Sequence, residues 1–166
     1  MTGIESTLSQ LDTFITFILG RLSSQPKIFL SGSSYGGSVI YQAAMISPKK
    51  YSGLLLFCPA LKDMKEMLWL KKKFSLFAKC LLPRVRCGKI SRKVPKYNQF
   101  DRISKDPHNI IDGVLLGNIA NGHHVMLEIE PTFGDFEAPY ILFQGGADKI
   151  VDMFGPIDLD KTTVYC

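Results

Sequence analysis

Apolar positions in the first third of the chain fall into two patterns, helical spacing and short continuous runs. Over residues 5–22, apolar side chains recur every three or four residues, which predicts a helix with one buried face. Short apolar runs at 27–32 and 53–58 indicate buried strands, and the segment 35–46 between them is compatible with a helix. Strands separated by helices in this way predict a parallel sheet in an α/β layer fold.

The hydrophobic pattern changes after Pro59. A long amphipathic pattern, with lysines among bulky apolar residues, continues to residue 82 and predicts one helix. After a polar, irregular stretch, helix-compatible sequence extends to residue 130. Strand character returns only in the run APYILF, residues 138–143, and we expect a last strand over residues 161–166.

This order of elements predicts a sheet core interrupted by one insertion. Residues 1–61 and 132–166 would form the two parts of the core, and residues 62–131 would form an all-helical cap. The expected fold is α/β, with a partial, mostly parallel sheet of three or four strands flanked by helices. A sheet this small would leave an exposed edge that favours association.

Composition agrees with a globular domain and narrows the classes of function. Of the 166 residues, 46% are hydrophobic and 21% are charged, which argues against disorder. The longest apolar runs are too short to span a bilayer, and no signal-peptide pattern is visible. The four cysteines and three histidines form no zinc-binding pattern, so we expect reduced thiols in a cytoplasmic protein, without metal or cofactor.

The net charge of +5 has two interpretations. The basic residues are concentrated between Lys62 and Lys105, but no RRM, zinc-finger or helix-turn-helix signature accompanies them, so we expect no nucleic-acid partner. A face attracted to anionic lipid explains the same charge equally well. The sequence does not indicate the oligomeric state.

Two serines in a glycine frame, FLSGSSYGGSV, form the first candidate site. Residues 32–36 satisfy G-x-S-x-G between a predicted strand and a predicted helix, which is the context of a nucleophile elbow. Small residues are expected two positions before and after the nucleophile, so the frame selects Ser34 rather than Ser33. The backbone N–H of Tyr35 would then face a developing oxyanion. A glycine-rich turn without chemistry is the alternative.

The second candidate is a carboxylate in the loop 145–152, just past the predicted strand at 138–143. Asp148 would lie at the edge where α/β sheets bind ligands, and it follows Ser34 in the chain order Ser…Asp. Asp152 is the rival carboxylate. For either residue, a helix-capping or loop-capping role is the alternative.

The segment KIFLSGSSYGGSVIYQAAMISPKKYSGLLLFCPAL resembles the nucleophile strand, elbow, helix and following strand of the monoglyceride lipase-like α/β hydrolases, also labelled serine aminopeptidase S33. Those proteins usually have G-H-S-M-G-G where this chain has G-S-S-Y-G-G. The segment APYILFQGGADKIVD resembles their strand and turn leading to the triad acid. The resemblance implies an α/β-hydrolase fold and a cofactor-free hydrolase of lipid esters such as monoacylglycerol or lysophospholipid. It makes Ser34 the nucleophile, Asp148 the triad acid and Asp152 an accompanying residue.

Two features of the family have no match in this chain. The family's catalytic His follows the acid segment, whereas His108, His123 and His124 all precede Asp148. The HG turn that supplies a second oxyanion donor is also unmatched. We therefore expect a chain truncated at both ends, as a fragment, an isoform or a degenerate paralogue, with little or no activity. The alternatives are a catalytically dead homologue that binds a lipid or a partner, and an esterase or acyltransferase acting on a soluble substrate.

The predicted cap raises the question of membrane contact. Residues 64–82 place lysines among bulky apolar side chains, as in helices that lie in a membrane interface. We favour a cap helix packed on its own core with a solvated lysine face, and keep peripheral membrane contact through the cap as the alternative. Leu68, Phe74 and Phe77 are candidate substrate contacts, and His123 and His124 would approach the site only if the cap folds over it.

Overall fold

The computed structural model describes residues 3–62, 84–87, 114–148 and 151–162. The chain divides into two compact units, residues 1–69 together with 121–166, and residues 70–120. Each unit is described by itself. The long helix predicted to reach residue 82, and with it the candidate contacts Leu68, Phe74 and Phe77, lies outside the described residues.

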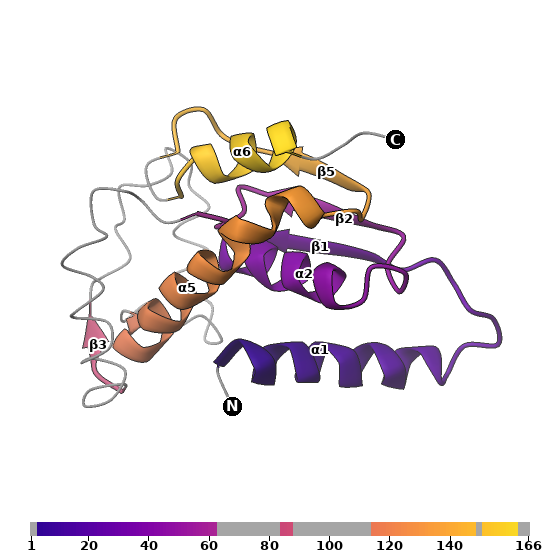
Figure 1. The fold of residues 1–166 in the computed structure, drawn as a ribbon. Helices are drawn as coiled ribbons and strands as arrows, with labels where there is room; N and C mark the ends of the chain where they lie inside the picture. The colour runs from indigo at the N-terminus through magenta and orange to yellow at the C-terminus, as the bar shows by residue number, and fades with distance from the viewer. Residues whose placement is uncertain (1–2, 63–83, 88–113, 149–150, 163–166) are drawn as a thin grey trace, which may run out of the picture. The chain divides into compact units, whose positions relative to one another are not determined.

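Three parallel strands form the sheet of the first unit, in the order β1-β2-β5 (Figure 1). The strands are β1 (Phe29–Ser33), β2 (Gly53–Phe57) and β5 (Tyr140–Phe143). Ser33 lies opposite Phe57, and Phe57 lies opposite Phe143, so the three carboxyl ends are in line. This confirms the predicted α/β fold with a small parallel sheet.

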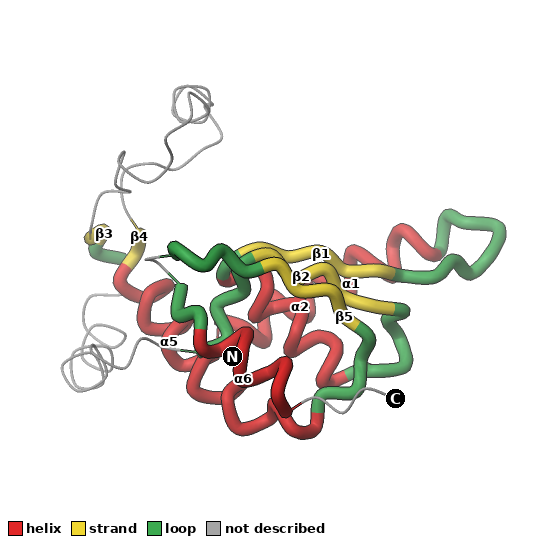
Figure 2. Tube along the Cα trace, turned by 90° about the horizontal axis from the view of Figure 1, so that it is seen from above, coloured by secondary structure: helices red, strands yellow, loops and turns green. Residues whose placement is uncertain are grey.

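Helices pack on one face of this sheet. The helices are α1 (Gly3–Leu19), α2 (Tyr35–Ile46), α5 (Leu116–Ile129), which continues as a 3-10 turn (Glu130–Asp135), and α6 (Phe154–Thr162). Figure 2 shows α2 and α6 on the same side of the strands. Leu30, Leu54 and Leu56 point to this side and are buried with residues of α2.

Tyr41 of α2 is the aromatic centre of this core. Its ring is fully buried, with its centroid 4.4 Å from that of Phe136 and 6.1 Å from that of Phe133. Its hydroxyl lies 3.0 Å from Thr132 Oγ1. Burial raises the pKa of Tyr41 to about 12, so the ring joins α2 to the 3-10 turn as a neutral group.

The opposite face of the sheet carries exposed apolar side chains. Phe29, Phe57, Ile141 and Phe143 are 40% to 60% exposed, and the Phe57 and Phe143 rings stack with their centroids 4.9 Å apart. Parallel sheets usually have both faces covered. Among the described residues, this face is therefore an apolar surface open to solvent.

Two sequence-based predictions about secondary structure are wrong. The insertion is not wholly helical, because β3 (Arg86–Cys87) pairs antiparallel with β4 (Val114–Leu115), and strands of two residues are too short to give a periodic pattern. The strand expected over 161–166 begins inside a helix instead, since α6 includes Lys161 and Thr162. Burial of Leu159 holds α6 against the core and outweighs the local preference for a strand. Residues 163–166 lie outside the described part.

The other predicted elements of the core occur with small shifts. The helix predicted over 5–22 is α1 and ends at Leu19, and the strand predicted over 27–32 is β1 and begins at Phe29. In the described segments, no helix is both long enough and apolar enough to cross a membrane.

Candidate active site

Ser34 occupies a strained turn between β1 and α2. Its φ of 53° and ψ of −125° lie in a region that non-glycine residues rarely adopt, at a cost of about 1–3 kcal/mol. Three hydrogen bonds hold this backbone: Ser34 N–H donates to the Phe57 carbonyl at 3.1 Å, and the Ser34 carbonyl accepts from Gly37 N–H and Ala60 N–H, both at 3.0 Å. The side chain is exposed and makes no capping hydrogen bond to α2. The fold therefore presents this hydroxyl to solvent.

Close approach of strand and helix explains part of the glycine frame. A Cβ on Gly32 would lie 2.5 Å from the Gly36 carbonyl oxygen and 2.9 Å from Gly37 N. A Cβ on Gly37 would lie 2.6 Å from Pro59 Cβ, whereas a Cβ on Gly36 would meet nothing within 4 Å. The expectation that the residue two after the nucleophile must be small for packing is therefore wrong. The tight positions are Gly32 and Gly37.

The loop after β2 braces the elbow from a distant part of the sequence. Pro59 fills the space above Gly37, Ala60 N–H bonds the Ser34 carbonyl, and the buried Ser38 hydroxyl donates to the Ala60 carbonyl. Sequence analysis did not identify these contacts. The only local signal was a proline just after a strand, which fits many turns.

Cys58, at the end of the central strand, is a second non-glycine residue with positive φ, at 43°. Its N–H donates to the Phe143 carbonyl at 2.7 Å, which extends the pairing of β2 with β5. Sequence analysis assigned it no role beyond that of a reduced thiol. Together Ser34 and Cys58 place two strained backbone positions at the carboxyl edge of the sheet, where α/β folds bind ligands.

Tyr35, the first residue of α2, packs its ring against α5. A Cβ on Gly122 would lie 3.7 Å from the Tyr35 ring, and burial raises the pKa of the Tyr35 hydroxyl. The backbone N–H of Tyr35 belongs to the first turn of α2, whose donors lack acceptors within the helix. This places the predicted oxyanion donor at the helix N-terminus next to Ser34.

Asp148 lies in the loop after β5, at the same edge of the sheet as Ser34. Its N–H donates to the Gly145 carbonyl, and its Oδ1 accepts from Val151 N–H, both at 3.1 Å. Asp152 Oδ1 instead accepts from Phe154 N–H at 2.8 Å, at the start of α6. Each carboxylate thus accepts a backbone N–H of its own loop, which is the capping contact given as the alternative for either acid, and the Asp152 contact lies at the start of α6.

The strand order gives the approximate distance between the strand that precedes Ser34 and the strand that precedes Asp148. Neighbouring strands lie about 4.8 Å apart, so β1 and β5, on either side of β2, lie about 10 Å apart. The two candidates therefore follow strands that are separated by one strand, at the same edge of the sheet.

The two described histidines are neighbours on α5 with different surroundings. His124 is exposed, and its Nε2 lies 3.2 Å from Glu128 Oε1, one helical turn away. His123 is 7% exposed and follows Gly122, which lies beside the Tyr35 ring. His124 therefore forms a surface pair, while His123 belongs to the interior near the elbow. His108 lies outside the described residues.

Comparison with known proteins identifies the family. The family described as serine aminopeptidase, S33, matches residues 1–161. The chain belongs to this family. The chain is similar to the monoglyceride lipase of Rattus norvegicus, with 25% identity over 162 residues, 92% of this chain and 54% of the relative. The chain thus spans about half the length of the curated relatives that it matches.

Solved structures confirm the α/β-hydrolase fold of this S33 chain. It is similar to the Paleococcus ferrophilus monoacylglycerol lipase, with a TM-score of 0.79 and 22% identity over 97% of this chain and 61% of that one. It is also similar to a soluble variant of the monoglyceride lipase of Saccharomyces cerevisiae solved with a substrate analogue, with a TM-score of 0.73 and 16% identity over 93% of this chain and 55% of that one.

Proposed function

We propose that this chain is a serine hydrolase of the monoglyceride lipase type, which hydrolyses carboxylic esters of lipids such as monoacylglycerol or lysophospholipid. The observation that carries the proposal is the backbone of Ser34, whose φ of 53° is held by three hydrogen bonds while its hydroxyl is exposed. A plain turn would gain nothing from this strain. The names of the similar lipases support the lipid substrate.

The proposed chemistry begins with attack of Ser34 Oγ on the ester carbonyl carbon. A base takes the hydroxyl proton, and the carbonyl oxygen becomes an oxyanion that accepts a hydrogen bond from Tyr35 N–H. A donor of this kind contributes about 3–4 kcal/mol to the transition state. The alcohol leaves with a proton from the base, and water then hydrolyses the acyl-serine by the same steps.

Asp148 would orient the base. The lack of a well-placed base would limit the rate of ester hydrolysis by the 166-residue chain. No histidine follows Asp148 in the sequence, where the resemblance expects one. We therefore expect the 166-residue chain to turn over esters slowly or not at all. His123 is the alternative base, since the residue before it packs beside Tyr35.

Hydrolysis of a monoacylglycerol, compared with that of a short soluble ester, tests this function. Any turnover should disappear in Ser34→Ala and fall strongly in Asp148→Asn, while Asp152→Asn should keep it, because that carboxylate caps α6. Faster hydrolysis of the soluble ester would favour an esterase of soluble substrates. Turnover that survives Ser34→Ala would refute the proposal.

A catalytically dead homologue that binds lipid is the second candidate. It is favoured by the described histidines, one paired with Glu128 on the surface and the other buried on α5. In that case the Ser34→Ala variant should bind a non-hydrolysable monoacylglycerol ether as well as the unmodified chain does, and neither should cleave the ester. The contacts proposed for the acyl chain at Leu68, Phe74 and Phe77 apply to both candidates.

A further inference from the structure

Both backbone polar groups of Ser34 are bound by one short segment that begins at the end of β2. Ser34 N–H donates to the Phe57 carbonyl at 3.1 Å, and the Ser34 carbonyl accepts from Ala60 N–H at 3.0 Å. We call residues 57–60 the elbow clamp. Cys58, with its positive φ of 43°, turns the chain between these two contacts. The strained backbone of Ser34 therefore depends on the position of the elbow clamp.

The bonds to the Ser34 carbonyl also fix the direction of the proposed oxyanion donor. The Ser34 carbonyl and the Tyr35 N–H belong to one trans peptide group, which is planar, so the C=O and N–H bonds point in opposite directions. Gly37 N–H and Ala60 N–H both donate to the carbonyl oxygen at 3.0 Å. A rotation of this carbonyl away from its donors would turn the Tyr35 N–H with it. The position of Ala60 thus helps to set where the oxyanion donor points.

Ser38 holds Ala60 through its side chain. Ser38 lies on α2 four residues after Ser34, it is fully buried, and its hydroxyl donates to the Ala60 carbonyl. A helical serine often bonds the carbonyl four residues earlier, but here that carbonyl already accepts from the elbow clamp. Without the hydroxyl, the Ala60 carbonyl would lose its buried partner. Because Ala60 is only partly buried, its peptide group could then turn toward water and release Ser34.

We propose that Ser38 is a positioning residue for ester hydrolysis at this site, which aims the Tyr35 N–H at the oxyanion by holding Ala60. This inference rests on the proposed function, because it needs Tyr35 N–H as the oxyanion donor. Ser38 is buried beneath the elbow, so its effect on the reaction passes through the Ala60 peptide group and the Ser34 carbonyl. A misdirected donor lowers the rate of attack on the carbonyl carbon even where the fold is kept.

Fluorophosphonate labelling of Ser34 in the 166-residue chain, with added imidazole, tests the proposal, because the phosphonyl oxygen takes the place of the oxyanion. Ser38→Ala should lower the rate constant of labelling about tenfold at a temperature well below its unfolding midpoint. Ser38→Thr, which keeps the hydroxyl, should retain most of the rate. Amide hydrogen exchange gives a second readout, since the Ala60 N–H should exchange about tenfold faster in Ser38→Ala.

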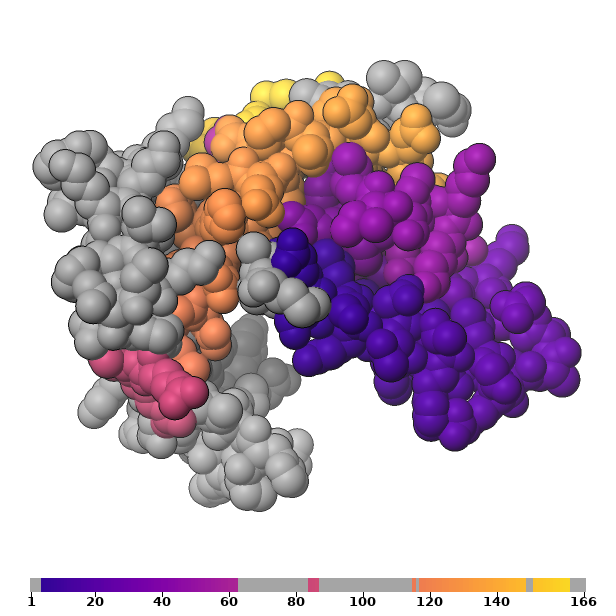
Figure 3. All heavy atoms as spheres, turned by 60° about the horizontal axis from the view of Figure 1, so that its bottom comes forward, coloured from indigo at the N-terminus to yellow at the C-terminus, as the bar shows by residue number. Residues whose placement is uncertain are grey.

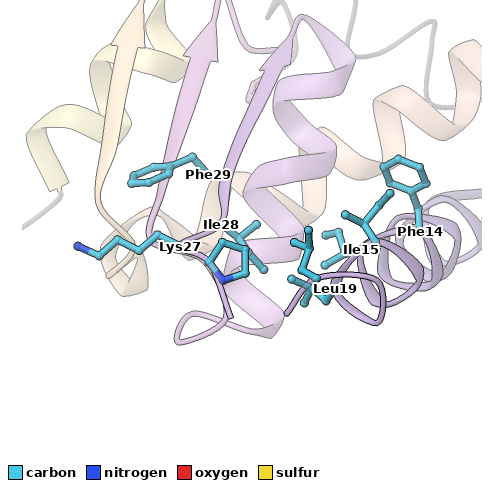
Figure 4. Close-up of a pocket in the computed structure, with 9 residues that line it drawn as sticks. Phe14, Ile15, Leu19, Lys27, Ile28 and Phe29 are labelled. Carbon is cyan, nitrogen blue, oxygen red and sulfur yellow. The ribbon is translucent and has the colours of Figure 1, made fainter. Parts of the chain in front are cut away.

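Two control variants separate positioning from stability and from binding of the probe. Tyr41→Phe removes another buried hydroxyl of α2, the one that lies 3.0 Å from Thr132 Oγ1, and should lower stability without slowing labelling. Phe14→Ser should also leave the rate unchanged. Phe14 lies on α1 at the surface of the first unit (Figure 3) and lines a groove of about 240 Å³ at the start of β1 (Figure 4), whereas Ser34 follows the end of β1.

The outcomes distinguish failure of this inference from failure of the proposed function. Equal labelling rates for Ser38→Ala and the unmodified chain would overturn the role of Ser38 alone, as would equal slowing by Tyr41→Phe or by Ser38→Thr. No labelling of Ser34 in the unmodified chain would refute the proposed function and the role of Ser38 with it. Circular dichroism checks folding. If Ser38→Ala is unfolded, Ser38→Cys decides the result, because its thiol fills the site but donates only weakly.

Discussion

The packing of the elbow predicts opposite effects for the two glycines of its G-x-S-x-G frame. In Gly32→Ala, the new Cβ would lie 2.5 Å from the Gly36 carbonyl oxygen, 2.7 Å from the Gly36 carbonyl carbon and 2.9 Å from Gly37 N. All three are backbone atoms of the first turn of α2, so no side chain can move aside. Relief requires the strand and the helix to move apart, which also shifts Ser34.

The expected loss of stability in Gly32→Ala is the cost of overpacking minus the stabilisation that comes from the lower entropy of the unfolded chain. Overpacking costs about 1–3 kcal/mol, and contact with backbone puts Gly32→Ala near the upper end. Replacing glycine by alanine returns about 0.4–1 kcal/mol through the unfolded state. The net loss of about 2 kcal/mol lowers the unfolding midpoint by about 4–8 °C for a chain of this size.

Gly36→Ala is the matched comparison, because its Cβ would meet nothing within 4 Å and the residue is helical. For Gly36→Ala only the stabilisation through the unfolded state remains, about 0.5 kcal/mol, and the midpoint of thermal unfolding should rise by about 1–2 °C. Thermal unfolding followed by circular dichroism measures both variants. Equal destabilisation by the two substitutions would refute this account of the elbow, as would a stable Gly32→Ala.

Two further predictions concern the core around the site. Burial raises the pKa of Tyr41 to about 12, above its unfolded value of about 10, so the stability that Tyr41 contributes is complete below pH 10 and is lost as the pH rises toward 12. Tyr41→Phe should reduce this alkaline loss in denaturation curves, and an unchanged alkaline slope would contradict the assignment. Lys62, 13% exposed, bonds Asp158 at 2.8 Å and Glu130 at 2.6 Å, and these bonds raise its pKa. Lys62→Met should lower the free energy of unfolding in urea by about 2 kcal/mol, which lies between the values for exposed and buried ion pairs. A loss smaller than that of an exposed ion pair would show that the bonds of Lys62 to Asp158 and Glu130 do not stabilise the fold.

The sequence identifies the core elements because their signals are local. The helix predicted over 35–46 has the bounds of α2, and the glycine frame correctly places Ser34 at the turn between β1 and α2. In contrast, no local pattern shows that Gly37 packs on Pro59 or that Ser38 bonds Ala60, since these residues are 22 positions apart and meet only through the pairing of β1 with β2. The prediction that residue 36 must be small was wrong for the same reason, because no local pattern shows that a Cβ on Gly36 would meet nothing within 4 Å.

Short elements and terminal segments were also beyond sequence reasoning. The β3–β4 pair has two residues per strand, fewer than any periodicity needs. At the other end, the β-branched run after Asp160 suggested a strand, whereas the cap at Asp152 and the burial of Leu159 carry the helix through Thr162. Tertiary packing, which the sequence does not show, decided that segment.

Labelling by a fluorophosphonate, with the modified residue mapped by mass spectrometry, tests the central claim that the fold presents Ser34 as a nucleophile. Ser33→Ala is the matched control, because Ser33 is the exposed neighbour within β1. The account predicts slow labelling at Ser34, acceleration by added imidazole, complete loss in Ser34→Ala and no change in Ser33→Ala. Labelling at Ser33, or none at Ser34 even with imidazole, would contradict it.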